Sequence, residues 1–445
     1  MSDQKEQSSI PTGKVERASH LVATGVRLGG NYVKHYTKKL LNGDTGKAEL
    51  HKDNAEDIYK TLSTLKGSAL KVAQMLSMDQ GMLPKEYVDK FSMAQYSAPP
   101  LSSPLVMSTF QKTLGKTPSQ LFDKFDIHAT NAASIGQVHK AEKDGKKLAV
   151  KIQYPGVANS VSSDLKLVKP FAIRLVGLKE TEMDKYFDEI ESKLLEETDY
   201  DLEVRRSIEL SEQCGHIADL IFPKYYPEMS SKRIITMDWL PGQHLKEFLK
   251  TNPSQDIKNQ AGQALWDFYH FQIHAIRKVH ADPHPGNFLF QPDGKVAIFD
   301  FGCVKEIPLS FYDNYFALVD RSIYEDEKLT RKIYMNLEMI HESDSEKDVI
   351  FFSGLFRTMI DLFTLPFTLD NFDFGNDQYF TDIYAYTEYL SNLKEIKDSK
   401  VARGSRHSLY INRTYFGLYS ILNELKANIQ THSSSIPKPE SLLIA

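Results

Sequence analysis

The chain is poor in cysteine, and it lacks an apolar N-terminal segment. Its 445 residues include two cysteines, Cys214 and Cys303, which are too few for a disulfide framework and show no metal-binding spacing. A reducing compartment is therefore the simpler expectation. Asp3 and Glu6 stand in a start without an apolar core, which excludes a secretory signal and makes a transit peptide a poor fit, so we expect no cleavage.

The chain also lacks an excess of positive charge. The formal net charge is −5 and the pI is about 6.3, whereas affinity for a nucleic-acid backbone comes from concentrated lysine and arginine. No nucleic-acid partner is expected. A length of 445 residues allows two to three lobes, and 41% hydrophobic with 25% charged residues is ordinary for a soluble globular protein.

Long apolar runs are missing as well. The most apolar stretch, residues 349–372, is interrupted by Arg357, Asp361, Pro366 and Asp370. A membrane-spanning helix needs about 20 predominantly apolar residues and tolerates such interruptions poorly. The sequence therefore predicts no transmembrane segment and a cytoplasmic location, with peripheral attachment to a membrane surface as the alternative.

The most informative segment that is present, residues 279–302, reads VHADPHPGNFLFQPDGKVAIFDFG. Phosphoryl transfer requires a carboxylate near the nucleophile and oxygen ligands that hold Mg²⁺ on the nucleotide. Asp282 is suited to orient or deprotonate the acceptor, and Asn287 and Asp300 are suited to bind the metal. Chance explains an isolated Asp and Asn, but it does not explain the hydrophobic strand 296–299 that runs into Asp300. We therefore expect ATP or ADP and Mg²⁺ as ligands.

A β-rich lobe is predicted from Gln137 onward. Two short β-rich runs flank Asp144-Gly145, which is a strong hairpin signal. Lys151 in the second run matches the strand that carries a phosphate-pairing lysine, although an exposed strand lysine would explain that residue alone. Before the hairpin, the small residues 131–136 permit close approach of backbone to phosphates, but they contain one glycine, Gly136, where a glycine-rich loop has three.

The first 100 or so residues are predicted to be helical. Residues 57–78 carry apolar side chains at alternating steps of four and three, which indicates one long helix. On its neighbouring stripe Lys71 and Gln74 point the same way. A solvated face and close approach to another element both explain them. Another helix is expected over 105–114.

One helix is also expected over 183–214, and it carries an acidic cluster. At 100° per residue, Glu196, Asp199 and Glu203 share a face, whereas Glu197 falls well away from Glu203. Periodicity does not decide which acid meets the strand lysine.

After this helix the sequence predicts a buried strand over 233–237, followed by a turn. In a kinase this is the hinge, where backbone groups hydrogen-bond adenine. Met237 and Trp239 are the candidates for that contact.

Taken together, NAASIGQVHKA, LAVKIQYPGV, EETDYDLEV, HADPHPGN and DFG resemble the UbiB/AarF family of atypical protein-kinase-like proteins. The resemblance is dense over residues 60–310 and also includes INRTYFGLYSIL near the C-terminus. It implies support of isoprenoid-quinone biosynthesis or lipid homeostasis through ATP hydrolysis, without ordinary protein phosphorylation.

The resemblance also implies roles for single residues. Lys151 would pair with Glu203. Asp282 and Asn287 would occupy the catalytic loop, and Asp300 would bind metal. The nucleotide-binding loop would be alanine-rich where other kinases have a glycine-rich one, and its matching residues here are Ala132, Ala133 and Ser134.

The family has a regulatory helix with a K-x-G-Q motif that folds over the site and contacts two acids, here Glu197 and Asp199. The matching residues are Lys71-Val72-Ala73-Gln74. Ala73 in place of glycine favours the helix by up to about 1 kcal/mol, but it adds a methyl group where close packing is needed.

Several absences indicate an atypical kinase. Ala281 replaces the arginine of His-Arg-Asp, no Ala-Pro-Glu follows Asp-Phe-Gly, and little room is left for a peptide-docking segment. A protein substrate is therefore not expected.

We thus predict an α+β, bilobal protein-kinase-like fold with a helical N-terminal extension packed over the active site. The expected parts are a flexible N-terminus (1–18), the extension (19–118), an N-lobe (119–237), a mostly helical C-lobe (238–430) and a flexible tail (431–445). The expected function is a UbiB-type ATPase that binds nucleotide, with isoprenoid lipid as a further partner. The alternatives are a nucleotide-gated scaffold for a lipid or partner protein and a small-molecule phosphotransferase.

Overall fold

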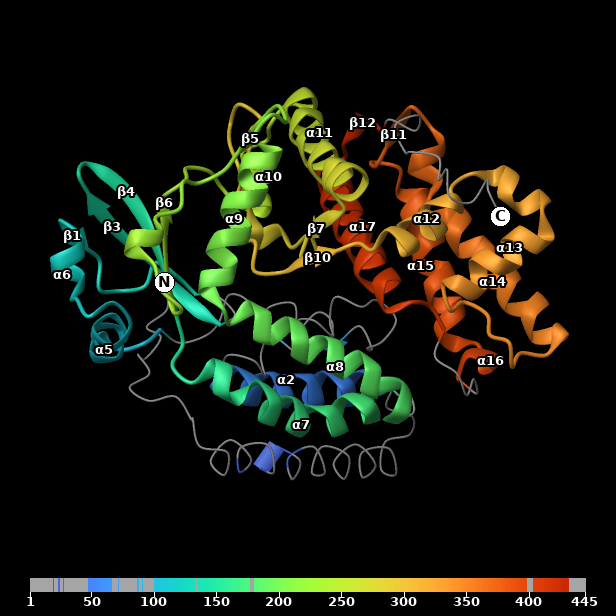
Figure 1. Ribbon diagram of the computed structural model, residues 1–445, viewed down its shortest axis with the longest axis horizontal. Helices are drawn as coiled ribbons and strands as arrows, with labels where there is room; N and C mark the ends of the chain where they lie inside the picture. The colour runs from blue at the N-terminus through green and yellow to red at the C-terminus, as the bar shows by residue number, and fades with distance from the viewer. Residues whose placement is uncertain are drawn as a thin grey trace. The chain divides into compact units, whose positions relative to one another are not determined.

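The structure is a computed structural model that describes residues 19, 23–24, 27, 47–65, 71, 86–87, 90, 100–132, 135–176, 180–397 and 403–431 (Figure 1). The chain divides into two compact units. The first unit comprises Met1–Ile208 and Lys224–Trp239, and the second comprises Glu209–Pro223 and Leu240–Ala445.

The first unit contains an antiparallel five-stranded sheet. Its strand order is β1-β3-β4-β6, with β2 also paired to β3. The strands are β1 (Lys124–Phe125), β2 (Asn131–Ala132), β3 (Gly136–Lys143), β4 (Lys146–Gln153) and β6 (Ile234–Asp238). The predicted hairpin is confirmed, because Asp144 and Gly145 join β3 to β4 with φ of 50° and 72°, the left-handed values that a two-residue turn requires. Strands β1 and β2 precede the expected start of the β-rich region, and at two residues each they leave no periodic signal.

The helices of the first unit include two that the sequence predicted in part. They are α2 (Lys47–Leu65), α5 (Ser103–Leu114), α6 (Pro118–Leu121), α7 (Val157–Val176), α8 (Glu180–Glu197) and the first half of α9 (Tyr200–Cys214), together with the 3-10 turn η2 (Pro227–Met229). Helix α5 confirms the expected helix at 105–114. Helix α2 begins ten residues before the predicted start, because its buried seam continues through Asn54, a polar residue that hides the apolar period.

The single helix predicted over 183–214 is wrong. Helix α8 ends at Glu197, and α9 begins at Tyr200. Asp199 lies between them, and its carboxylate accepts a hydrogen bond from the Leu202 N–H at 3.0 Å, as an N-cap does. The predicted common face of Glu196, Asp199 and Glu203 therefore does not exist. Helices α7 and α8 lie side by side (Figure 1).

The second unit is mainly helical, as expected, with three small sheets. Its helices are α10 (Leu245–Lys250), α11 (Gln255–Phe271), α12 (Leu309–Ala317), α13 (Glu327–Asn336), α14 (Glu346–Phe363), α15 (Asp377–Asn392), α16 (Lys394–Lys397) and α17 (Arg406–Leu425), with shorter turns η3 (Gln272–Ile276), η4 (Pro285–Asn287), η5 (Arg321–Glu325) and η6 (Leu365–Thr368). In one small sheet β9 (Val296–Ile298) lies between β5 (Leu220–Ile221) and β8 (Phe288–Phe290). The other two sheets pair β7 (Lys278–His280) with β10 (Val304–Glu306) and β11 (Asn371–Asp373) with β12 (Asn428–Gln430). One aromatic-rich core surrounds Trp266, which is 1% exposed.

Strand β12 follows the last helix, α17. The sequence predicted no strand there, only a flexible tail that begins at residue 431. Side chains of α11 bind the outer edge of β12: Asn259 accepts from the Asn428 N–H at 2.9 Å, and Gln263 exchanges two hydrogen bonds with the backbone of Gln430. Four residues of helix rise about as far as two residues of strand, so the two spacings match. Thr431 is buried, and residues 432–445 lie outside the described part of the chain.

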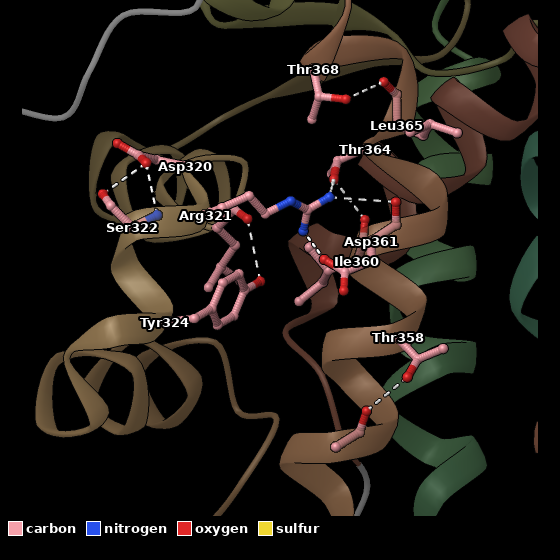
Figure 2. Close-up of polar contacts among 12 residues, drawn as sticks. Asp320, Arg321, Ser322, Tyr324, Thr358, Ile360, Asp361, Thr364, Leu365 and Thr368 are labelled. Atoms are coloured by element: carbon pink, nitrogen blue, oxygen red, sulfur yellow. Dashed lines mark hydrogen bonds and ion pairs between the residues drawn. The ribbon is translucent and has the colours of Figure 1, made fainter.

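The apolar stretch 349–372 runs through most of α14, the turn η6 and the start of β11, and its Arg357 and Asp361 make packing contacts. Figure 2 shows the Arg321 guanidinium against α14, where it contacts the Asp361 carboxylate and donates to the Thr364 hydroxyl at 3.1 Å. The Arg357 guanidinium lies 4.4 Å from the centroid of the Tyr324 ring. Among the described residues, no helix has both the length and the apolar character needed to cross a membrane.

Candidate active site

Lys151 is buried in the first unit and paired with an acid. It lies on β4, between Val138 of β3 and Ile235 of β6. Its ammonium Nζ is 2.7 Å from Glu203 Oε1, and the two side chains are 8% and 3% exposed. An exposed strand lysine is therefore excluded, because two charges this deeply buried are tolerated only as a pair. The pairing of this lysine with phosphate stays a prediction.

The neighbouring acids Glu196 and Glu197 lie at the end of α8 and pair with other cations. Glu197 Oε1 lies 2.9 Å from Lys71 Nζ, with side chains 13% and 5% exposed. Glu196 receives hydrogen bonds from Arg206 at 2.7 Å and Lys193 at 2.9 Å. Burial alone would raise the pKa of Glu196, but these two cations outweigh burial and hold its pKa below the ordinary value.

The predicted regulatory residues are described only in part. Lys71 is helical and 4% exposed, so it does not lie on a solvated face. Asp199 is exposed and caps α9. Ala73 and Gln74 lie outside the described residues, so the structure does not describe the contacts of the predicted lid beyond Lys71.

The predicted phosphate loop shows a packing reason for its glycine. A β-carbon on Gly136 would lie 2.5 Å from the Ile152 carbonyl oxygen and 2.9 Å from the Tyr200 hydroxyl. No side chain fits there, with or without a nucleotide. Ala132 ends β2, and Ala133 and Ser134 lie outside the described residues.

The predicted hinge residues lie near the end of β6, the strand that pairs with β4, and directly after it. Met237 is buried in β6 opposite Ala149. The Trp239 N–H donates to the Lys147 carbonyl at 2.9 Å, so a nucleotide base would have to use the Trp239 carbonyl. Beside them, burial and a hydrogen bond to Asp238 raise the pKa of Tyr226 to about 12.

Asp282 and Asn287 come together in the second unit, on the loop between β7 and β8. Both are buried, at 5% and 4% exposure. The loop is closed by the His284 N–H on the Asp282 carbonyl at 2.7 Å and by the Asn287 side-chain amide on the same carbonyl at 2.9 Å. Because Asn287 donates to this carbonyl through Nδ2, its Oδ1 points away from the carbonyl. Oδ1 is the atom that a cation would require.

Asp300 follows β9 and is half-buried. Its Oδ1 accepts the Gly302 N–H at 3.0 Å, which shapes the Asp-Phe-Gly turn. Phe301 is fully buried with its ring centroid 5.5 Å from that of His280, and His280 Nδ1 lies 3.0 Å from the Tyr269 hydroxyl. Burial, with the nearby Asp282 charge, raises the pKa of Tyr269 well above its ordinary value, so this hydroxyl stays protonated.

Asn287 and Asp300 are of the residue types that would hold a magnesium ion bound together with a nucleotide. Within the described ranges, no group of three or more His, Cys, Asp and Glu is arranged to hold a metal. Mg²⁺ is usually held by one or two carboxylates together with phosphate oxygens and water. The carboxylate of Asp300 and the amide oxygen of Asn287 are donors of this kind.

Sequence reasoning missed Arg413, on α17. Its Nη2 lies 3.2 Å from Asp282 Oδ1, and both side chains are 7% exposed. The segment INRTYFGLYSIL belonged to the family resemblance without a role for any residue. The only signal was an arginine four residues before Gly417 within that segment.

The family model of the ABC1 atypical kinase-like domain matches residues 93–334, more than half of the chain. The chain belongs to this family. Among its relatives, the mitochondrial atypical kinase COQ8 of Saccharomyces cerevisiae is 30% identical over 355 residues, which cover 78% of this chain and 70% of that protein. A chloroplastic aarF domain-containing protein kinase of Arabidopsis thaliana is 29% identical over 296 residues, which cover 66% of this chain and 42% of that protein. The resemblance to the UbiB/AarF family is thereby confirmed.

This chain spans only part of the length of some of its relatives. It covers 42% of the Arabidopsis protein and 60% of the probable serine/threonine-protein kinase abkA of Dictyostelium discoideum. A solved structure, Rv3197 with erythromycin from Mycobacterium tuberculosis, matches 88% of this chain and 98% of its own with a TM-score of 0.59 at 24% identity. That likeness supports the kinase-like fold of mixed helices and sheets.

Proposed function

We propose that this ABC1-family chain is a Mg²⁺-dependent ATPase of the UbiB type that supports isoprenoid-quinone or lipid metabolism. The observation that carries the proposal is the Lys151–Glu203 pair. A lysine in the middle of a sheet, 8% exposed and 2.7 Å from a carboxylate, matches the ion pair that a kinase-like enzyme needs for the nucleotide phosphates.

The remaining roles follow the chemistry of each residue. Asp282 orients the attacking group, while Asn287 and Asp300 supply oxygens to Mg²⁺, which when bound neutralises phosphate charge. Gly136 and residues 132–134 are the candidates for contact with the nucleotide phosphates. Of the hinge candidates Met237 and Trp239, the Trp239 carbonyl is the backbone group that would bind the base. The proposed location is cytoplasmic or at a peripheral membrane surface, although the names of the yeast and Arabidopsis relatives place those proteins in mitochondria and chloroplasts.

The Lys71–Glu197 pair supports a regulatory lid. Lys71 comes from the N-terminal segment and reaches the end of α8 at 2.9 Å, where both side chains are largely shielded from water. In the proposed enzyme, Lys71 and Gln74 with Glu197 and Asp199 hold the lid, and its release controls turnover. An isoprenoid lipid or a membrane surface is the proposed activator.

The test compares the wild-type chain with Asp300→Asn. The wild type is expected to hydrolyse MgATP and to gain thermal stability with Mg²⁺ and nucleotide, as binding to the folded state requires. D300N is expected to lose both the hydrolysis and the Mg²⁺-dependent part of the stabilisation. The matched control is Asp293→Asn, an exposed aspartate in the turn before β9, which should behave as wild type.

Three results would change the assignment. D300N with wild-type hydrolysis would refute it. Stabilisation by Mg-nucleotide without turnover, even with anionic liposomes or phenolic activators, would favour the scaffold. Rapid phosphorylation of a soluble alcohol would favour the small-molecule phosphotransferase.

A further inference from the structure

Helix α17 lies directly against the loop that carries Asp282. Arg413 and Gly417 are four residues apart, so they share one face of this helix. The Arg413 guanidinium is 3.2 Å from the Asp282 carboxylate. A β-carbon on Gly417 would lie 2.4 Å from Pro283 Cγ and 3.1 Å from the Pro283 carbonyl oxygen. The backbone of α17 therefore contacts the residue that follows Asp282, and only glycine permits this approach.

The same face of α17 also contacts a second segment near Asp282, strand β10. Tyr410 precedes Arg413 by three residues, and its ring centroid lies 4.7 Å from Lys305 Nζ. Lys305 is on β10, where it pairs with Val279 of β7, the strand that leads into Asp282. Helix α17 thus contacts the Asp282 loop and the strand after Asp-Phe-Gly through neighbouring turns.

The Asp282 carboxylate sits where water screens it poorly. Its side chain and that of Arg413 are each 7% exposed, and Ala281 beside it is fully buried. Charges interact more strongly in such surroundings than in water. A guanidinium is planar and permanently charged, so it restrains the orientation of a carboxylate as well as its charge. On the other side, Asn287 Nδ2 lies 3.5 Å from Asp282 Oδ2, so the two carboxylate oxygens face different neighbours.

We propose that Arg413 is a positioning residue, which orients the Asp282 carboxylate for the reaction. This inference rests on the proposed function, because it assigns Asp282 to the chemistry. Ala281 offers no charged side chain at the position before Asp282, and the charge comes instead from Arg413 of α17, 131 residues later in the chain. The orientation of Asp282 therefore depends on the packing of α17 and not on a phosphorylated loop.

The test uses the full chain with Arg413→Met and Arg413→Lys, and with Arg406→Met as the control, an exposed arginine in the first turn of the same helix. R413M is expected to lower kcat for MgATP hydrolysis about 100-fold, the usual effect of a misplaced group. KM for MgATP and the thermal stabilisation by nucleotide should stay at wild-type values. R413K should recover part of the lost kcat, because its ammonium keeps the charge without the planar fork. R406M should match wild type.

Two outcomes would overturn the inference. One is R413M with wild-type kcat. The other is an equal loss in R413M and R413K together with a raised KM and lost nucleotide stabilisation, which describes a structural role. If R413M does not fold, Arg413→Gln replaces it, and Arg413→Gln with Asp282→Asn should be no slower than D282N alone.

D282N separates this inference from the proposed function. D282N with wild-type turnover would refute the function. D282N without turnover beside a fully active R413M or R413Q would overturn the positioning role alone.

Discussion

Removal of one member of the Lys151–Glu203 pair should strongly destabilise the protein, whereas replacement of both members with apolar residues should change its stability little. Lys151→Met leaves the Glu203 carboxylate, 3% exposed, without its ammonium, and Glu203→Met leaves the reverse. Removal of one partner of a buried pair costs about 3–5 kcal/mol, whereas an apolar pair of similar volume is nearly neutral. We therefore expect each single variant to be strongly destabilised. The double variant should recover at least about 2 kcal/mol relative to the sum of the two.

Scanning calorimetry can measure this coupling in the transition of the first unit. For a unit of about 220 residues, each kcal/mol shifts the midpoint by about 2–4 °C. Each single variant should then lower the midpoint by about 6–20 °C, and the double variant should return most of the way. MgATP hydrolysis should be lost in all three, because the double variant restores packing and not the charge.

A surface pair provides the matched control. Lys124 and Glu142 are also 2.7 Å apart, but their side chains are 76% and 40% exposed. The same two methionine substitutions there should show no measurable coupling, since water screens exposed pairs. Additive costs at Lys151 and Glu203 would refute the reasoning on burial. A double variant with wild-type hydrolysis would refute the role of the pair in catalysis.

Two further predictions concern packing and pH. Gly136→Ala should lower the free energy of unfolding by about 1–3 kcal/mol, since its methyl group would lie 2.5 Å from the Ile152 carbonyl oxygen. The control Gly354→Ala, whose methyl group would meet no atom within 4 Å, should not destabilise the protein. An unchanged melting temperature in G136A would contradict the geometry. Burial, and to a lesser extent His270, holds the pKa of His274 well below the ordinary 6.5, so the unfolded chain binds the proton first as pH falls. The contribution of this residue to the stability of the second unit should be complete above pH 6.5, and below that pH the unit should lose at most about 1.4 kcal/mol per pH unit. His274→Gln should flatten the dependence of the unfolding free energy on pH, measured by urea unfolding. An unchanged pH dependence would be the contrary result.

Local patterns in the sequence predicted those elements whose cause is local. The β3–β4 hairpin follows from Asp144-Gly145, which take the positive φ that the turn requires. The seam of α2 was predicted only from Ile58 onward, since Asn54 interrupts the apolar period although its side chain is buried. A polar residue that is buried by tertiary packing leaves no periodic signal.

The acidic cluster shows where periodicity fails. An ideal helix through Thr198 and Asp199 groups Glu196 with Glu203. The chain breaks there because an aspartate N-cap competes with the continued helix. The resemblance to the family selected Glu203 as the partner of Lys151, a choice that periodicity left open, and in the structure these two are 2.7 Å apart.

Arg413 could not be predicted from local pattern, since its partner lies 131 residues earlier in the chain. Buried ion pairs of this kind are weak sources of stability, because desolvation offsets most of the attraction and a well-packed apolar pair would serve the fold equally well. The first unit has such a pair at Lys151 and the second at Asp282, with side-chain exposures of 8% or less. In each pair one member is a residue to which the proposed function assigns a role in phosphoryl transfer. Under that proposal, the need for a charge at a fixed position explains both pairs better than stability does, and the same argument extends to the proposed positioning role of Arg413.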